Sequence, residues 1–418
     1  MRFEYYVLLS QLALFPLAAL IYGFRASIIS LVLCLYGPAA SLVKFSIGPA
    51  IFPLGSMVAL IGIIALIFIS PINKNLFAYV LLVFLGSLLV SLLGSGISGL
   101  ISALHFLLYT IFGLLLGHYL SKFDVNRRNN FIKAFIFYAS MSFVILMVVR
   151  FIGVNITNSL IDMRDVGFGM LPMLVIFIIL LQGPSLKTLT KSAIPFIYLL
   201  SSLTRSYLLD LVFVVIYSRK RLIKGVFFKP IFFSILILGV SFIFLSRASS
   251  SSNPTINNNQ EQYEELAQVL TLTTRLNGLL TEWDDFTKSP IYGNGIAYYE
   301  TAFSEFKAQG LDTISDDEYI AYNHIGVISV LAQGGIILFI LTLIIPCYII
   351  FTKRKIIFKS NDPLLFACMC LFLGFFILFF VSGSPVKKDY SDGILYYFVI
   401  GYIYCFPHRN HKMTKKIS

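Results

Sequence analysis

Arginines and a single histidine stand beside a small polar turn in a chain that is otherwise rich in apolar side chains. The turn reads SPIYGNG, from Ser289 to Gly295; Arg275 precedes it, and His324 opens the apolar run that follows. An arginine carries a permanent charge on a planar fork of donors that suits anionic oxygens, and a histidine can accept a proton near neutral pH. The plainer alternative is that the turn is a connector and that His324 is an interfacial histidine.

The composition around these residues is that of a membrane protein. Of the 418 residues, 58% are hydrophobic and 12% are charged, and the mean hydropathy is +0.85. Apolar runs of about 17–25 residues can each cross the ~30 Å hydrocarbon core as a helix that satisfies its own backbone hydrogen bonds. We therefore predict an all-α, polytopic transmembrane bundle. The candidate spans are about 5–23, 27–43, 51–70, 76–94, 99–120, 131–149, 170–184, 186–204, 206–218, 226–246, 325–351, 363–382 and 393–407.

The first span and the cysteines were examined for a signal peptide and for disulfide bonds. The first span is kept as a helix, because no small-residue cleavage site follows it and Arg25 lies just beyond. All the cysteines fall in or at apolar spans, which favours core packing over a disulfide framework. They are Cys34, Cys347, Cys368, Cys370 and Cys405.

The net charge is +12, and the basic residues gather in the short links between spans. This distribution is typical of the cytoplasmic side of a membrane protein, and we therefore do not interpret the charge as a nucleic-acid-binding surface. With those links in the cytoplasm, segments 44–50, 154–169, 247–323 and 383–392 lie outside and the C-terminus lies inside. The basic positions include Lys122, Arg127, Arg128, Lys187, Lys191, Arg219, Lys220, Arg221, Lys224, Lys353, Arg354 and Lys355.

The number of spans has two solutions. Counting 186–204 and 206–218 separately gives thirteen spans and an outside N-terminus, with the turn LTRS at the outer face. Merging them gives twelve spans, but it puts four basic residues outside, which are Lys74, Lys122, Arg127 and Arg128. The charge distribution favours the separate reading.

We divide the chain into an N-terminal transmembrane bundle (1–246), a large outer loop (247–323), C-terminal transmembrane helices (324–408) and a basic tail (409–418). The loop opens with a Ser/Asn-rich run, predicted to be a linker, and continues with apolar positions at helical spacing. These positions predict amphipathic helices that lie on the membrane-embedded body. Trp283, the only tryptophan, suits an interface.

The order of several short motifs resembles a known family. An Arg stands between two helices in Thr204-Arg205-Ser206, and the outer loop places Arg275 before Trp283; then come Pro-x-x-Gly-x-Gly at 290–295, His324 before a helix, and the pair Gly334-Gly335. This order resembles the bacterial O-antigen polymerase and O-antigen ligase superfamily of polytopic, GT-C-like membrane glycosyltransferases. The resemblance covers about 186–351 by motif. Asn323 precedes His324 where the family often has Asn or Ser after it, and Thr-Arg-Ser stands where many members have Ser-Arg-Gly.

The resemblance implies transfer of a glycan from undecaprenyl diphosphate to a sugar hydroxyl, at the periplasmic face of the bacterial inner membrane. The implied partners are lipid-linked oligosaccharide repeat units as donor and acceptor, the bilayer, and a chain-length regulator and a flippase acting in the same process. No nucleic acid and no cofactor is implied, because the leaving group is already a diphosphate.

The same resemblance distributes roles among the residues. Arg205 and Arg275 are the leading candidates to stabilise the diphosphate, and His324 is the candidate base. Glu282 and Asp285 compete for the role of base. The remaining candidate substrate-binding residues are Arg164, Arg150, Tyr292, Asn294, Tyr322 and Asn323.

Metal-assisted transfer is the less favoured chemistry. No Asp or Glu occurs between Glu4 and Asp124, so the first outer loop lacks the acidic pair that metal-dependent lipid-linked sugar transferases use. Among functions, a polymerase is favoured over a ligase, which would use the lipid A core as acceptor. A lipid-linked oligosaccharide flippase or another transporter is the alternative from a different class, but it would be expected to show midspan charges or two similar halves.

Overall fold

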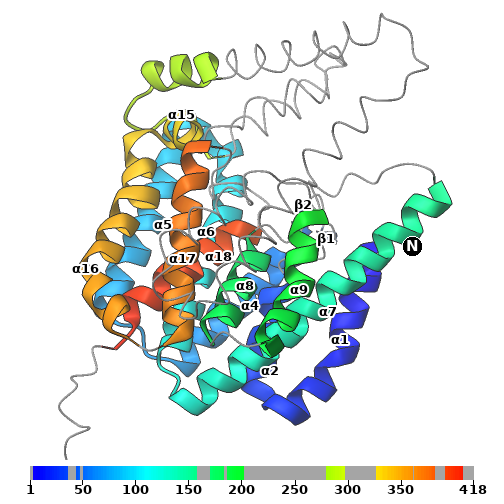
Figure 1. The fold of residues 1–418 in the computed structure, drawn as a ribbon. Coiled ribbons are helices and arrows are strands. Elements are labelled where there is room, and N and C mark those ends of the chain that lie inside the picture. The colour runs from blue at the N-terminus through cyan, green and yellow to red at the C-terminus, as the bar shows by residue number, and fades with distance from the viewer. Residues whose placement is uncertain are drawn as a thin grey trace, which may run out of the picture.

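The chain folds into a bundle of helices (Figure 1). The computed structural model describes residues 3–35, 44–47, 50–157, 170–182, 186–201, 279–296, 326–360, 362–381 and 391–407. The helices are α1 (Phe3–Tyr22), α2 (Phe24–Leu35), α4 (Leu54–Ile69), α5 (Lys74–Gly94), α6 (Gly96–Ser121), α7 (Val125–Thr157), α8 (Leu171–Leu181), α9 (Leu186–Ser201), α15 (Gly326–Phe339), the π-helical turn η1 (Ile340–Ile344), α16 (Ile345–Lys359), α17 (Pro363–Val381) and α18 (Ser391–Cys405). Residues 279–288 form a further helix.

The prediction of a mainly helical protein is confirmed for this part of the chain, and its apolar helices are compatible with a membrane protein. Four helices are long and apolar enough to cross a membrane by length and composition, and six more apolar helices are shorter. The four are Lys74–Gly94, Ala103–Ser121, Val125–Val148 and Gly326–Lys359. The predicted spans 206–218 and 226–246 lie outside the described ranges, so the choice between twelve and thirteen spans stays a prediction.

One segment differs from the all-helical expectation. Two short strands, β1 (Lys44–Ile47) and β2 (Ala50–Pro53), pair antiparallel, with Phe45 opposite Phe52. The sequence had placed 44–50 in a short outer segment and 51–53 at the start of the predicted span 51–70. α4 therefore begins at Leu54 rather than at residue 51, with Pro53 as its N-cap.

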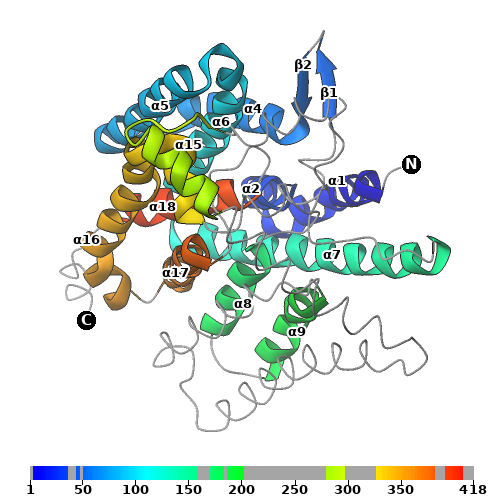
Figure 2. The same ribbon diagram turned by 90° about the horizontal axis from the view of Figure 1, so that it is seen from above.

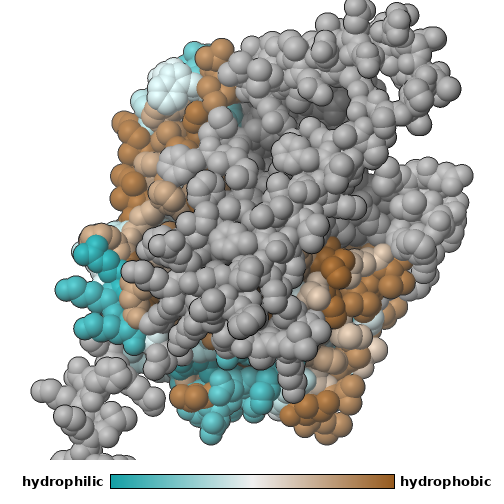
Figure 3. Space-filling model, in the orientation of Figure 1, coloured by the Kyte–Doolittle hydropathy of each residue, from teal (hydrophilic) through white to brown (hydrophobic). Residues whose placement is uncertain are grey.

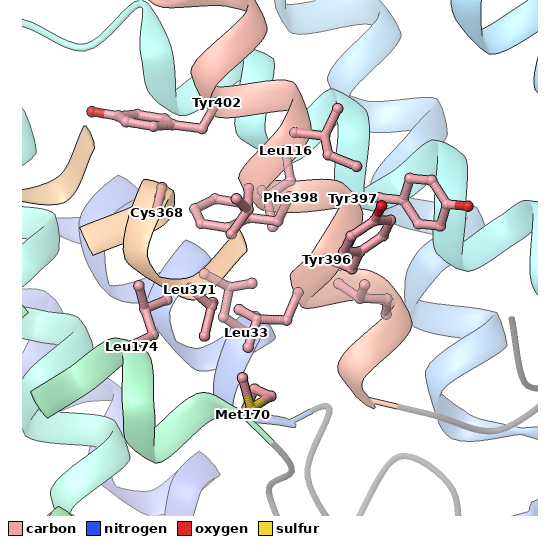
Figure 4. Packing of buried hydrophobic residues seen from close by; sticks show 14 of the residues in the cluster. Leu33, Leu116, Met170, Leu174, Cys368, Leu371, Tyr396, Tyr397, Phe398 and Tyr402 are labelled. Carbon is pink, nitrogen blue, oxygen red and sulfur yellow. The ribbon is translucent and has the colours of Figure 1, made fainter. Parts of the chain in front are cut away.

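The centre of the bundle is the contact between α6 and α18, whose side chains Leu116 and Phe398 are among the buried residues in Figure 4. Small residues bring these two helices close together. A Cβ on Gly113 would lie 2.6 Å from the carbonyl oxygen of Ile394, and one on Gly117 would collide with the backbone at Phe398. Gly113 and Gly117 form a Gly-x-x-x-Gly pair, which lets helix backbones approach within a membrane. Tyr396, Tyr397 and Tyr402 of α18 are fully buried around this contact, and the buried Cys34, Cys368 and Cys370 also belong to the core.

The links between helices gather at two opposite ends of the bundle. At one end, buried Arg128 forms an ion pair with Asp362, donates to the carbonyl of Phe123 across 2.7 Å, and lies over the ring of Phe406. Lys122 of the same end donates to the carbonyl of Pro71 at 2.7 Å. Exposed basic side chains surround these contacts, and the lower end of the space-filling view is hydrophilic beside hydrophobic flanks (Figure 3). They are Lys74, Lys122, Arg127, Lys133, Arg354, Lys355 and Lys359.

The long helical segment from α15 to α16 contains a π-helical turn with a clear cause. Pro346 has no N–H to donate to the carbonyl of Thr342, and the N–H of Ile345 donates to Ile340 instead of Leu341. The two released carbonyls accept from tyrosines: Tyr79 donates to Leu341 at 2.9 Å, and Tyr396 donates to Thr342 at 2.6 Å. This irregular turn is thus held by α5 and α18, as buried backbone requires.

Candidate functional site

The polar turn at 289–295 lies at the end of the bundle opposite the basic side chains (Figure 1). Helix 279–288 ends just before Pro290, and the chain reverses with the N–H of Gly293 bonded to the carbonyl of Ser289 at 2.8 Å. Gly293 and Gly295 have φ values of 63° and 101°, which L side chains rarely adopt. The prediction that these glycines permit a backbone turn is confirmed.

The turn inserts into a break in α15. Gly335 has φ 59° and ψ −162°, which separates the helix into two parts. An unbroken helix would bond the N–H of Ile336 to Ala332 and that of Ile337 to Gln333. Here Ile336 and Ile337 donate instead to the carbonyls of Pro290 and Ile291, at 2.9 and 3.3 Å.

The released carbonyls of α15 are satisfied by the same turn. The N–H of Asn294 donates to Ala332 at 2.9 Å, and the N–H of Gly295 donates to Gln333 at 2.7 Å. Four backbone hydrogen bonds thus replace two helical ones, and they join segments about forty residues apart in the sequence. We call this arrangement the spliced turn: residues 290–295 bonded to residues 332–337.

Glycines are needed where the two backbones meet. A Cβ on Gly293 would lie 2.5 Å from the carbonyl carbon of Gln333, and one on Gly335 would collide with the carbonyl of Ile291. A third segment joins them at the α5–α6 junction, where Ser95 Oγ donates to the carbonyl of Asn294 at 2.5 Å. A Cβ on Gly94 would meet the backbone of Asn294 and Gly295. The turn at 290–295, the break in α15 and the α5–α6 junction are therefore held against one another at this end of the bundle.

Carboxylates lie on the helix that leads into the spliced turn. Glu282 is 2% exposed, and Asp285, one turn further on, is half-buried. Asp284 is exposed and pairs with Lys288 at 2.6 Å. Figure 2, which looks down on this end, shows helix 279–288 crossing above α15. Glu282 is therefore a buried acid on the helix that leads into the spliced turn, and carboxylates are among the side chains that can act as a general base.

The predicted orientation of this helix is wrong in part. Its apolar positions were expected to lie on the membrane-embedded body, but Leu280 is 62% exposed and Trp283 is 49% exposed, while the acid Glu282 is buried. Helical periodicity had shown which residues share a face, but it could not show which medium that face contacts.

The remaining predicted site residues are divided between the described and the undescribed parts of the chain. Tyr292 and Asn294 are half-buried in the spliced turn, alternating with its glycines. Arg150 belongs to α7, but its side chain is outside the described part. The other predicted residues lie outside it altogether: Arg205, Arg275, Arg164, His324, Tyr322 and Asn323.

Sequence reasoning missed two polar residues at this end, Ser95 and Gln333. Ser95 lies between two glycines at the boundary of two spans, and Gln333 directly precedes the Gly334-Gly335 pair. Gln333 is 4% exposed, and its amide donates to Ser329 Oγ at 2.9 Å. A polar residue next to a glycine in an otherwise apolar stretch is the signal that could have found both.

A second polar cluster lies within the helices. The hydroxyl of Ser56 lies 2.7 Å from Nδ1 of His105 and 3.1 Å from the hydroxyl of Tyr109. His118 Nε2 lies 3.1 Å from the carbonyl of Pro71 at the basic end. Both histidines belong to α6. In the part of the chain that the structure describes, no three His, Cys, Asp or Glu residues group as metal ligands would.

Comparison with protein-family models and with curated proteins finds no match for this chain.

Proposed function

We propose that the protein is a surface-polysaccharide polymerase of the O-antigen type. It transfers a glycan from undecaprenyl diphosphate to another lipid-linked repeat unit at the periplasmic face of the bacterial inner membrane. The spliced turn is the observation that carries this proposal. Two motifs of the family resemblance, Pro-x-x-Gly-x-Gly and the Gly pair, are bonded to each other by their backbones at one end of the bundle.

The charge distribution supports the side assigned to the site. Exposed basic residues surround the end of the bundle that holds Lys122, Arg127 and Arg354, and such residues favour the cytoplasmic side. The spliced turn lies at the opposite end, and it is therefore periplasmic in this proposal. Lipid-linked glycans would meet it at the surface of the membrane.

The proposed reaction is a displacement at the anomeric carbon of the donor sugar. The acceptor hydroxyl oxygen forms the new bond, the bond to the diphosphate oxygen breaks, and undecaprenyl diphosphate leaves with the electron pair. Arg205 and Arg275 stabilise the charge that develops on the leaving diphosphate. His324 accepts the hydroxyl proton.

The structure adds weight to Glu282 as the alternative base. It lies in helix 279–288, two turns before the spliced turn, and is almost fully excluded from water. Asp285 is more exposed and so is the weaker candidate of the pair.

The buried charges give no support to a transporter. Among the residues whose burial is described, the buried charged side chains are Arg128, Glu282 and Asp392. Asp392 accepts from the N–H of Met170 at 2.8 Å, in the first turn of α18, and Arg128 lies near the start of α7. These charges lie at or near helix ends rather than along a path through the middle of the bundle, where transporters place them.

The test is transfer by the purified protein in lipid nanodiscs. Lipid-linked repeat units extracted from the encoding bacterium serve as donor and acceptor, and lipid A core is supplied in a parallel reaction. We expect chains of several repeat units and release of undecaprenyl diphosphate without lipid A core. Transfer only onto lipid A core would assign a ligase instead, and no transfer in either reaction would refute the proposal.

A further inference from the structure

Helix 279–288 has three distinct faces. With about 100° between successive residues, Leu280 and Trp283 share one side with the partly buried Leu279 and Phe286. The ion pair of Asp284 and Lys288 occupies a second side, exposed to solvent. Glu282 occupies the third side and is buried.

The apolar face is exposed although it carries large side chains. Leu280 is 62% exposed and Trp283 is 49% exposed, and the Trp283 ring lies 5.4 Å from that of Phe286. Ile291, in the adjoining spliced turn, is 61% exposed. Such a patch is costly in water and indicates a contact with lipid or with a partner.

The patch continues a stripe of exposed apolar side chains on the bundle. The long segment from α15 to α16 exposes apolar side chains every fourth position, and these are Ile336 (46%), Ile340 (41%), Ile344 (47%) and Tyr348 (68%). The top of this stripe adjoins the patch, because Ile336 donates to the carbonyl of Pro290 at 2.9 Å. Figure 3 shows hydrophobic surface running up this flank of the bundle.

We propose that helix 279–288 is an interfacial helix. Its apolar face, formed by Leu280, Trp283 and Ile291, lies in the headgroup region of the leaflet at this end of the bundle. The exposed acid–lysine pair faces the water, as the polar side of such a helix does. A tryptophan is the side chain that favours this depth. The lipid surface then passes beside the spliced turn, and this holds whether or not the protein is a glycosyltransferase.

Trp283 makes the proposal directly measurable, because it is the only tryptophan in the chain. The full-length protein is placed in nanodiscs of phosphatidylcholine whose acyl chains carry bromine, either near the glycerol or near the methyl ends. Aqueous iodide is titrated in parallel. We expect strong quenching of Trp283 by bromine near the glycerol, weaker quenching by bromine near the methyl ends, and little quenching by iodide.

Two variants in a Trp283→Phe background calibrate depth. Ile344→Trp reports a position deeper along the hydrophobic stripe, and Asn129→Trp reports an exposed position near the start of α7. Both variant proteins must elute from a size-exclusion column as single species before their fluorescence is measured. The native tryptophan is expected to be quenched less by deep bromine than Ile344→Trp, and far less by iodide than Asn129→Trp.

Two results would overturn the proposal. Quenching of Trp283 by iodide to the extent seen for Asn129→Trp would place the helix in water. Resistance to both iodide and bromine would show that protein, such as a second copy of the chain, covers the patch.

Discussion

The N–H of Gly295 donates to the carbonyl of Gln333, which would accept from the N–H of Ile337 in an unbroken helix. The N–H of Gly295 lies 2.7 Å from the carbonyl oxygen of Gln333, and the N–H of Ile337 is turned to Ile291 at 3.3 Å. The turn is therefore joined to α15 by its backbone rather than by side chains. Because a backbone contact of this kind requires glycine on both sides, small substitutions can test it.

Replacement of Gly293 by alanine should release the spliced turn. A residue held at φ 63° costs about 1–3 kcal/mol without glycine, and the added Cβ would also press on the backbone at Gln333. We expect a lowered midpoint of thermal unfolding in detergent and faster proteolysis at the turn. Gly23→Ala is the matched control, because its φ is 88° but no atom lies within 4 Å of its added Cβ. Equal effects of the two substitutions would contradict the close backbone contact.

The helices were predictable because each needs only a long apolar run, and the runs at α5, α6, α7 and α17 show this plainly. The spliced turn was not predictable. It rests on backbone hydrogen bonds between residues about forty positions apart, and backbone groups leave no mark on the sequence except the glycines that permit them. For the same reason the glycines were recognised as a turn, but their partner in α15 was not.

Two other differences from expectation also have local causes. The strand pair of 44–47 and 50–53 was missed because 44–50 was interpreted as a short outer segment and 51–53 as the start of a span. The direction of the Leu280–Trp283 face was missed because periodicity cannot distinguish burial in protein from contact with lipid. The arginines and His324 proposed for catalysis remain predictions from the sequence.

The ion pair between Arg128 and Asp362 should be important for stability. Both side chains are about nine-tenths buried, and Asp362 also caps α17 by accepting from the N–H of Leu365 at 2.9 Å. Removing one partner of a buried pair costs about 3–5 kcal/mol, so Arg128→Ala should strongly lower the unfolding midpoint. Arg127→Ala breaks only an exposed pair with Asp124 and should change stability by less than about 1 kcal/mol. Similar losses for both variants would show that the buried pair has no special role.

The orientation of the bundle can be tested with reporter fusions. If the basic end is cytoplasmic, alkaline phosphatase fused after Asn258 should be active, since that enzyme requires the periplasm. A fusion after Lys355 should be inactive, because Lys355 belongs to the exposed basic residues. Activity at Lys355 would reverse the orientation and remove the site from the periplasm.

Leaving-group stabilisation by arginine predicts that transfer does not require a divalent metal ion. Elongation of lipid-linked repeat units by the purified protein should continue in excess EDTA, while a metal-dependent transferase in the same buffer loses its activity. The acid Asp284 is already paired with Lys288. Loss of elongation that magnesium or manganese restores would assign the charge stabilisation to a bound cation.

The most direct test of the proposed function is the length of the polysaccharide made by variants of Arg205 and His324. In a deletion strain of the encoding bacterium, Arg205→Ala and His324→Ala should each reduce polymerisation about a hundredfold, as loss of one stabilising group in an active site does. Arg205→Lys should restore it only in part, because an ammonium keeps the charge and loses the planar fork. Arg247→Ala, in the predicted linker, is the control. When immunoblots show equal abundance in the membrane, we expect the gel ladder to shrink to single repeat units for the two alanine variants and to stay full for Arg247→Ala. Full ladders from Arg205→Ala and His324→Ala would contradict the proposed function.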